Sequence, residues 1–326
     1  MGKVMTVSGP VAASLLGYCQ CHEHLLISKG TSFQINPALW MDDIDKSTEE
    51  VLKYKGAGGD TVIDAQPGGC NRMEEGLLEI SERTGTHIIS STGFHKLMFY
   101  SDTHWIHRMP QDELYHFFRE ELEEGMYKEI DCGYPEKQTK IRAGIVKTAL
   151  DREGLSPRYI KLFGAASQAA IDSEVPLMVH IEPGSEPKRL LEFLLEMGVW
   201  RHRIIFCHMD REIKEIDYYL SVLKEGITLE FDTIGRFHYH DDISELALIK
   251  EILDRGYSRQ LLLSLDTTRE RLTSYTPNGA GLTYLLCNFL PKLKKMGVSK
   301  EQILNVTVQN VQNIFMNEYG RDRYEQ

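Results

Sequence analysis

Eight short runs rich in β-forming residues alternate with helical stretches along this chain of 326 residues, and this alternation limits the folds open to it. Strands separated by helices favour parallel pairing through right-handed crossovers. Eight such units are what a (β/α)8 barrel, or TIM barrel, requires, so we expect this α/β fold. The candidate strands are GYCQCHEH, DTVIDAQ, THIISSTGF, IRAGIVKTA, VPLMVHIE, RIIFCHMD, ITLEFDTI and QLLLSLDT.

No Pro-, Gly- or Ser-rich linker divides the chain, and barrels of this length commonly form one domain, so we expect a single domain over residues 1–326. Helical spacing of apolar residues predicts helices at 47–58 and 186–198. The longest departure is an insertion at about 95–138, after the third strand, with several aromatic residues and an acidic amphipathic helix. It has two interpretations: a barrel helix with a packed surface loop, or a lid or subunit contact.

Potential metal ligands stand near the ends of five strand candidates. An open, doubly wound sheet could use the same alternation, but it would separate the first strand from the last. A closed barrel brings all carboxyl ends to one face, where such side chains can meet. The residues are His22 and His24 in the first strand, Lys147 in the fourth, His180 in the fifth, His208 in the sixth and Asp266 in the eighth.

Strand periodicity predicts which neighbours share a face with these ligands. Residues two apart point the same way, so His22 and His24 can chelate one ion. Glu23 then faces away and is interpreted as a structural acid, and Cys21 and Cys207 are also expected to face away from the metal. Imidazole and carboxylate ligands without thiolate pairs suit zinc or a similar divalent ion in a hydrolytic site.

A lone histidine beside an apolar run is more often a hydrogen-bonded core residue, so the metal hypothesis depends on the ordered set. The histidines outside this set are assigned to loops or helix ends without a metal role. They include His104, His107, His238 and His240.

Composition excludes several classes of protein. A formal net charge of −11 disfavours a broad nucleic-acid surface, because phosphate neutralisation needs clustered Lys and Arg. No apolar stretch approaches the roughly 18 residues that a membrane span requires, and the early VAASLL segment lacks the basic flank of a secretory signal. Six cysteines without a CxxC pair fit a reducing compartment, so a cytoplasmic location is expected.

Lys147 is the unusual member of the ligand set, because a protonated ammonium beside two metal cations would be repelled. A buried lysine can lose its proton, and the free amine can take up carbon dioxide to form a carbamate. Such a carboxylate could bridge a two-metal hydrolytic site. The alternative is a salt-bridged or snorkelling lysine.

The chain resembles the phosphotriesterase-like branch of the amidohydrolase superfamily over nearly its whole length. The resemblance rests on MTVSGPVAASLLGYCQCHEHLL, GGDTVIDAQ, IRAGIVKTA, VHIEPG, FCHMD, LSLDTT and TVQNVQNIF, and above all on the order of the ligands. It implies two divalent ions, for which zinc is expected and manganese, cobalt or iron also fit. His22, His24 and Asp266 would hold the more buried ion and His180 and His208 the more exposed one, with carboxylated Lys147 and a hydroxide between them.

The resemblance also implies roles for two carboxylates. Asp266 would accept the proton of the hydroxide during attack and pass it outward. Asp232, in LEFDTIGR, matches a family position near the proton-exit path, and its alternative is a loop-capping carboxylate. Relatives of this kind are commonly homodimers, so a homodimer is expected.

The family includes lactonases, carboxylesterases and organophosphate hydrolases, and the loops must distinguish them. Here the loops are polar and cationic, which suits an anionic small-molecule substrate; we expect a lactone, specifically a phosphorylated sugar lactone. A phosphotriesterase or phosphodiesterase is the alternative, and a non-catalytic metal-bound ligand-binding protein is the alternative of another class. The candidate substrate-binding residues are Lys29, Asn71, Arg72, Arg236, Arg269, Arg271 and Tyr275, although surface ion pairs could instead explain several of them, Arg271 above all. The PGGCNRM turn departs from the Gly-Arg-Asp pattern of the family.

Overall fold

Eight parallel strands form a nearly closed barrel in the computed structural model, which describes residues 2–316. Their order around the barrel is β12-β11-β10-β9-β8-β5-β4-β3, and every neighbouring pair in this order is parallel. Seven strands lie within the predicted runs and β8 ends one residue beyond its run, so the barrel prediction is confirmed. The bounds are β3 (Cys19–Glu23), β4 (Thr61–Asp64), β5 (His87–Gly93), β8 (Ile145–Leu150), β9 (Leu177–Ile181), β10 (Ile204–Cys207), β11 (Thr228–Phe231) and β12 (Leu261–Leu263).

The seam between β3 and β12 is closed by hydrogen bonds at the carboxyl ends of both strands. The backbone N–H of Asp266 donates to the carbonyl of His22 at 3.0 Å. The buried carboxylate of Glu23 accepts from the backbone N–H groups of Leu265 and Thr267 and from the hydroxyl of Ser264. Glu23 is therefore a structural acid, as its place on the strand predicted.

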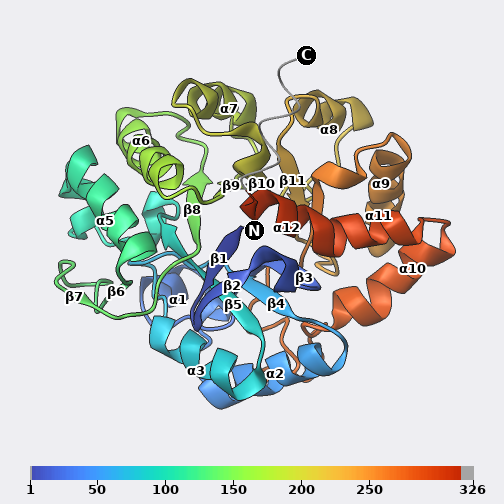
Figure 1. The fold of residues 1–326 in the computed structure, drawn as a ribbon, viewed down its shortest axis with the longest axis horizontal. Coiled ribbons are helices and arrows are strands. Elements are labelled where there is room, and N and C mark those ends of the chain that lie inside the picture. The colour runs from blue at the N-terminus through green and yellow to red at the C-terminus, as the bar shows by residue number, and fades with distance from the viewer. Residues whose placement is uncertain (1, 317–326) are drawn as a thin grey trace.

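Helices surround the barrel as an outer ring (Figure 1). The two predicted helices are present as α2 and α7. The ring contains α2 (Ile44–Gly56), α3 (Glu74–Thr84), α5 (Gln111–Glu123), α6 (Pro157–Asp172), α7 (Pro187–Glu196), α8 (Ile216–Leu223) and α9 (Asp242–Asp254), followed by α10 (Leu290–Lys295) and α11 (Lys300–Leu304). Two π-helical segments, Leu285–Phe289 and Asn305–Gln309, adjoin α10 and α12, and short 3-10 turns occupy Ala13–Leu15, Pro37–Leu39, Leu97–Phe99, Arg201–Arg203 and Ser258–Gln260. No helix among residues 2–316 is both long and apolar enough to cross a bilayer.

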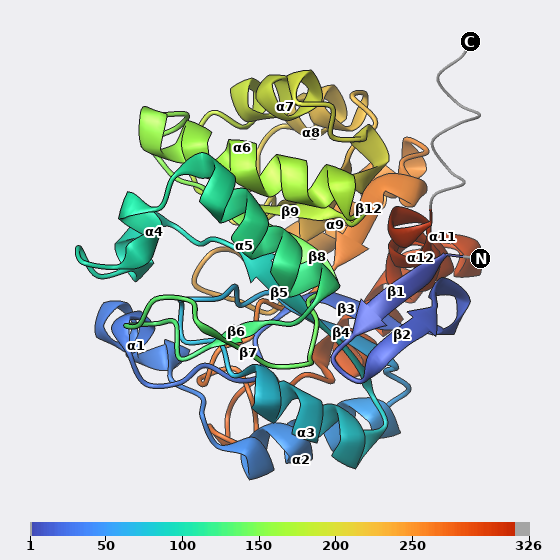
Figure 2. The same ribbon diagram turned by 60° about the vertical axis from the view of Figure 1, so that its left-hand side comes forward.

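A hairpin that strand counting did not predict covers one end of the barrel. Its strands β1 (Lys3–Thr6) and β2 (Gly9–Ala12) are antiparallel, and α12 (Asn310–Phe315) lies beside it in the centre of the ring (Figure 1). Val4 and Ile314 pack with Ile63 and Ile205 in one buried cluster inside the barrel. Figure 2 shows the hairpin at one end of the molecule and α1 (Thr31–Ile35) and α4 (Trp105–Arg108) at the other. Apolar side chains thus fill the hairpin end of the barrel, and we expect a functional site at the opposite end.

The predicted insertion contains α4, α5 and a small hairpin of β6 (Tyr127–Lys128) and β7 (Lys137–Gln138). Leu114, Phe117 and Phe118 of α5 join the main core, so α5 serves as the barrel helix after β5. The loop beyond it is tied back because the indole N–H of Trp105 donates to the carbonyl of Ile130 at 2.8 Å. These contacts support the interpretation as a barrel helix with a packed loop; a subunit contact stays a prediction.

The loop should lose stability in acid because of His104. Its Nδ1 accepts the backbone N–H of Ile106 at the start of α4, while its Nε2 lies 3.1 Å from the carbonyl of Ile130, so the ring must be neutral. Burial lowers the pKa of His104 to about 4, below its unfolded value near 6.5. Stability from this neutral ring is complete above pH about 6.5 and falls as the pH drops towards 4, by up to about 3 kcal/mol. His104→Asn, which keeps a capping oxygen, should flatten this part of the stability profile measured by urea unfolding; an unchanged slope would contradict the assignment.

Candidate metal centre

Four of the predicted ligands converge on one place: His22 in β3, His24 just after it, Lys147 in the middle of β8 and Asp266 after β12. The Nζ atom of Lys147 lies 3.0 Å from Nε2 of His22. The Oδ1 atom of Asp266 lies 3.4 Å from Nε2 of His24 and 4.0 Å from Nε2 of His22. All four side chains are buried. One ligand atom from each of His22, His24 and Asp266 fits within a 4.8 Å group, which is compatible with a shared ion.

The other two predicted ligands lie beside this group. The ring centroids of His180 and His208 are 4.4 Å apart, and His208 lies 4.7 Å from His22. A ligand atom of His208 also fits within 4.8 Å of Asp232 and Asp266. The structure therefore brings all six predicted residues to one buried place.

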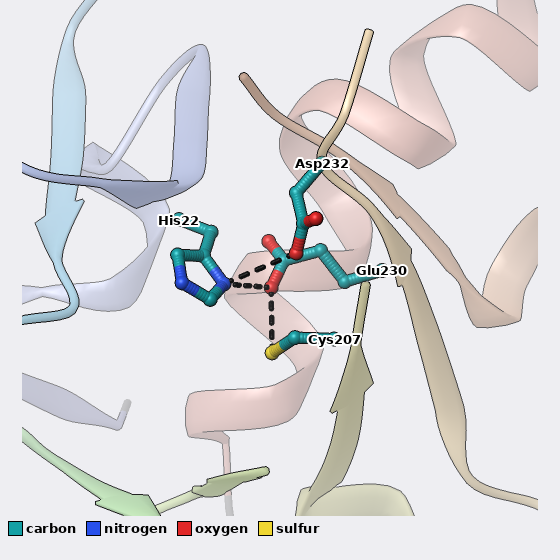
Figure 3. Close-up of side chains that lie close together, drawn as sticks. All are labelled: His22, Cys207, Glu230 and Asp232. Atoms are coloured by element: carbon teal, nitrogen blue, oxygen red, sulfur yellow. Dashed lines mark hydrogen bonds and ion pairs between the residues drawn. The ribbon is translucent and has the colours of Figure 1, made fainter. Parts of the chain in front are cut away.

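In three of the four candidate histidines, a carboxylate outside the ligand set contacts one ring nitrogen and so orients the ring. Nδ1 of His22 lies 3.1 Å from Asp232 and 3.3 Å from Glu230 (Figure 3). Asp232 also lies 2.6 Å from Nδ1 of His208 and accepts the backbone N–H of that residue. Fixing one ring nitrogen in this way leaves the other for a metal and sets the ring direction. Asp232 is thus the shared partner of two imidazoles, a more specific role than a loop cap.

His180 has a separate carboxylate partner. Its Nε2 lies 2.8 Å from Oε2 of Glu182, which also pairs with Lys96 at 2.9 Å. The ring of His180 is therefore turned with Nδ1 as the nitrogen free to ligate a metal. In contrast, Nδ1 of His24 is buried and has no hydrogen-bond partner among residues 2–316.

The prediction that Cys21 and Cys207 face away from the metal is wrong. Both belong to the cluster inside the barrel, and Sγ of Cys207 lies 3.1 Å from Oε2 of Glu230 (Figure 3). A register shift between Gln20 and Glu23 in β3 interrupts the alternation, because a β-bulge places one extra residue on the strand. The alternation of side chains between the two strand faces also ends after β10, because His208 adopts a left-handed backbone conformation with φ +60°.

Left-handed backbone at the strand ends aims two of the candidate ligands. His208 and Asp266 have φ values of +60° and +50°, which are uncommon for residues with a side chain. Strain of this kind costs on the order of 1–3 kcal/mol and persists where surrounding contacts enforce it. Here the carboxylate of Asp232 accepts the N–H of His208, and the carbonyl of His22 accepts that of Asp266.

Glu230 is a site residue that the sequence analysis missed. Its carboxylate lies between His22 and Cys207 on the inner face of β11 (Figure 3). Burial raises the pKa of the Cys207 thiol well above its usual value, so Cys207 is a thiol that donates to Glu230 rather than a thiolate ligand. The only sequence signal was the position of Glu230 two residues before Asp232, on the same strand face.

The protonation states of His180, His208 and Asp266 suit a metal, whereas His22 must lose a proton to ligate one. Burial and Lys147 would lower the pKa of His22, but Asp232 and Glu230 raise it to about 9. Burial, with Arg211 nearby, lowers the pKa of His180 and of His208 well below the ordinary range, so both rings are neutral at pH 7. Burial would raise the pKa of Asp266, but Arg236 and the hydrogen bond from His24 hold it well below its usual value. Neutral imidazoles and an ionised carboxylate are the ligand forms that divalent ions require. The residues present therefore fit a metal site.

Two of the predicted substrate contacts after β4 are corrected, because protein partners occupy them. Arg72 is buried and forms a two-pronged ion pair with Glu121, at 3.0 and 2.6 Å, and also donates to the carbonyls of Ser91 and Tyr127. The side chain of Asn71 binds Asp131 at 3.2 Å. A guanidinium with these partners has no donors left for a substrate anion.

Removing the Arg72 side chain should therefore destabilise the fold. Arg72→Ala leaves Glu121, which is 0% exposed, as an uncompensated buried charge. We expect a loss of about 3–5 kcal/mol in the free energy of unfolding. The matched change Arg119→Ala, which breaks an exposed pair with Glu123 on the same helix, should cost less than about 1 kcal/mol. Equal values from denaturant titration would contradict the structural role of Arg72.

The prediction that Tyr275 contacts the substrate is also wrong, whereas Lys29 and Arg269 stay accessible to a substrate. The hydroxyl of Tyr275 donates to the carbonyl of Asp43 at 2.7 Å, so it anchors the loop before α2. Lys29 Nζ and Arg269 Cζ each lie 4.7 Å from the ring centre of Trp40. Two cations thus contact one indole, with Lys29 exposed and Arg269 partly buried.

Arginines surround Asp266 on its outer side. Arg236 pairs with Oδ2 of Asp266 at 3.1 Å and donates to its carbonyl oxygen. Arg211, which the sequence analysis missed, lies 3.3 Å from the same Oδ2. Arg271 is buried and donates to the carbonyl of Ile234, so it is not a surface ion pair. Arg211 stands three residues after His208, and that position at a strand end was the available signal.

A pocket of about 240 Å³ reaches the candidate centre between the loops that follow β9 and β10. His208 and Arg211 form its inner part, and Glu182, Ser185 and Tyr218 contribute to its walls. A small polar molecule could approach the histidines by this route.

Comparisons with known proteins agree with this geometry. The model of the Phosphotriesterase family matches residues 2–315. A phospho-furanose lactonase of Mycoplasmopsis synoviae is 31% identical over 319 residues, which are 95% of this chain and 90% of the relative. The crystal structure of an amidohydrolase from Mycoplasma synoviae superposes with a TM-score of 0.88 at 29% identity, over 96% of this chain and 92% of that one. A lactonase structure from Listeria monocytogenes gives a TM-score of 0.86 at 25% identity, over 96% and 99%. The chain therefore belongs to the phosphotriesterase family, and it is a metal-dependent hydrolase.

Proposed function

We propose that this enzyme opens a lactone ring, with a phosphorylated furanose lactone as its substrate, using two divalent ions. The observation that carries the proposal is the convergence of four imidazoles, Lys147 and Asp266 at the open end of the barrel. The names of the lactonase relatives from Mycoplasmopsis synoviae and Listeria monocytogenes support the substrate class.

The six residues divide into two ligand groups in this proposal. His22, His24 and Asp266, which share a 4.8 Å group, would hold the inner ion. His180 and His208, which line or border the pocket, would hold the outer one. Zinc is the expected metal, and manganese, cobalt or iron suit the same N and O donors. When bound, the ions supply an activated water and Lewis-acid polarisation of the carbonyl under attack.

Lys147 would link the two groups as a carbamate. Its Nζ, adjacent to Nε2 of His22, bonds to the carbon of carbon dioxide and releases one proton, which converts the amine into a carboxylate. As the free ammonium it would instead repel both ions. Its complete burial protects the carbamate from exchange with bulk water.

The two oxygens of Asp266 are suited to different tasks. Oδ1 faces His24 and His22, so it is the ligand oxygen. Oδ2 is paired with Arg211 and Arg236 and would receive the proton of the attacking water as general base. Asp232, held between His22 and His208, would keep both rings oriented while the proton leaves.

The substrate anion would meet cations at the rim. Lys29 and Arg269, which both contact the ring of Trp40, are the rim cations of the predicted set that lack a carboxylate ion pair among residues 2–316. Arg211 and Arg236 add positive charge deeper in the site, which would draw an anion inward.

A substrate screen tests the reaction class. Phosphorylated furanose lactones, their unphosphorylated counterparts and aryl phosphoesters are compared by kcat/KM with the metal-loaded enzyme. We expect a preference of at least about tenfold for the phosphorylated lactone, equivalent to about 1.4 kcal/mol of transition-state binding. A larger kcat/KM for a phosphotriester or phosphodiester would replace lactone opening by the organophosphate alternative.

Arg269→Met should separate recognition of the anion from chemistry. Loss of one charge-assisted contact is expected to raise KM for the phosphorylated lactone by about 10- to 100-fold, with little change for the unphosphorylated lactone. Arg255→Met, at an exposed position on the end of α9, is the control and should leave both values unchanged. Equal effects on both lactones would show that Arg269 does not bind the phosphate.

A further inference from the structure

A second buried cluster of potential ligands lies beyond Asp232, away from the candidate centre. Asp210 follows β10, His240 belongs to the connection after β11, and Glu245 lies in the first turn of α9. One ligand atom from each fits within a 4.8 Å group. Asp210 and Glu245 are 0% exposed, and His240 is partly buried.

Three of the four carboxylate oxygens of Asp210 and Glu245 have no hydrogen-bond donor in the described part of the chain. They are both oxygens of Glu245 and Oδ1 of Asp210. Oδ2 of Asp210 accepts the N–H of Thr233, and Nδ1 of His240 approaches Oε2 of Glu245 only to 3.6 Å. A buried carboxylate without partners costs several kcal/mol, so a positive group is expected between them.

The protein itself does not supply that group. The buried guanidinium of Arg271 interacts electrostatically with Glu245, but no ion pair joins the two among residues 2–316. Nε and Nη1 of Arg271 also lack hydrogen-bond partners there, and its Nη2 donates to the carbonyl of Ile234. Burial raises the pKa of the Glu245 carboxyl well above its usual range, and the neighbouring Asp210 adds to this through charge repulsion and a hydrogen bond between the two carboxyl groups. Either a shared proton or a bound cation can relieve this repulsion.

We propose that Asp210, His240 and Glu245 bind a further divalent cation, separate from the metal pair. Two carboxylates and one imidazole suit manganese, iron or zinc, with water completing the coordination. The sequence analysis gave His240 no metal role, and this proposal departs from it; the three residues come from three segments that only the fold brings together. Ligation would also join α9 to the loop of residues 232–241, whose Arg236 contacts Asp266. The cation would thereby hold a residue of the active site from outside it.

Metal counting tests the proposal with manganese as the probe. Metal-free protein is loaded with Mn²⁺, desalted and analysed for metal per chain. Glu245→Gln is expected to bind one ion fewer than the wild type, and Glu251→Gln, an exposed change on the same helix, to bind the same number. His240→Ala, a less buried change, should also lose one ion and serves if Glu245→Gln fails to fold. Anomalous diffraction should place the lost ion between Asp210 and Glu245.

The outcomes separate this site from the proposed metal pair. An unchanged manganese count in both Glu245→Gln and His240→Ala would mean that a shared proton balances the carboxylates, and it would overturn the proposal. The pair is tested independently by Lys147→Ala, which should keep the ion at Glu245. If Glu245→Gln and His240→Ala keep all their manganese, the site at Glu245 is wrong. If Lys147→Ala keeps all its manganese, the proposed metal pair is wrong.

Discussion

Lys147→Ala is expected to remove about two divalent ions per chain and to lower kcat/KM by well over 100-fold, beyond the 10- to 100-fold typical of changes to residues that merely support metal ligands. The reason is electrostatic and geometric. Nζ of Lys147 lies 3.0 Å from Nε2 of His22 at the centre of the ligand set, so a carbamate there contributes negative charge between the two cations. Elemental analysis and steady-state kinetics measure both losses.

Two further variants at this position distinguish a carbamate from an ordinary cation. Lys147→Arg keeps a positive charge but cannot form the carbamate, so it should fail like the alanine variant. Lys147→Glu supplies a carboxylate directly and should recover part of the bound metal. Lys137→Ala, an exposed lysine of β7 paired with Glu129, is the control and should keep both metal and activity. Full activity in Lys147→Arg would end the carbamate assignment.

Asp266→Asn is expected to lower kcat by about 10²- to 10⁴-fold, the range of a lost general base. The amide keeps an oxygen on the side of His24 but can no longer take a proton at the position of Oδ2. It also leaves Arg211 and Arg236 without their shared carboxylate, so some loss of stability will accompany the kinetic effect. Kinetics and metal analysis on one preparation separate the two effects.

The matched control is Asp254→Asn, at an exposed position that pairs with Lys250 on α9. It should leave kcat within about twofold of the wild type, as is usual for surface changes. If Asp266→Asn retained metal and also retained kcat, another group would have to receive the proton.

The strands and the metal ligands were predictable because each depends on short-range patterns. The strands are short, largely buried runs that recur before helical segments, and parallel pairing in a barrel then brings the carboxyl ends together. His22, His180 and Asp266 could be selected because they stand at those ends. Glu23 was interpreted correctly because it was expected to point away from His22 and His24, and its carboxylate accepts the backbone N–H groups of Leu265 and Thr267.

Local irregularities and long-range partners were not predictable in this way. The bulge in β3 and the left-handed backbone of His208 both reverse the expected alternation, which is why Cys21 and Cys207 face the interior. No periodic signal reports a single added residue on a strand.

The partners of the loop cations could not be predicted from the sequence either. Arg72 and Arg269 look equivalent in sequence, but Glu121, on a helix some fifty residues away, engages the first, and Trp40 stacks with the second. An arginine beside a strand end can serve a substrate or a buried acid, and only the partner decides between them. The amino-terminal hairpin was missed because its two four-residue strands carry no pattern that distinguishes them from a loop.

The most direct test of the metal-pair mechanism is the intact mass of the chain measured under native conditions, wild type against Lys147→Ala. Beyond the change in amino acid, the wild type should be heavier by one carbon dioxide and two metal ions, and that difference should disappear in carbonate-free, chelator-treated protein together with activity. An active, metal-loaded wild type with an unmodified Lys147 would contradict the account.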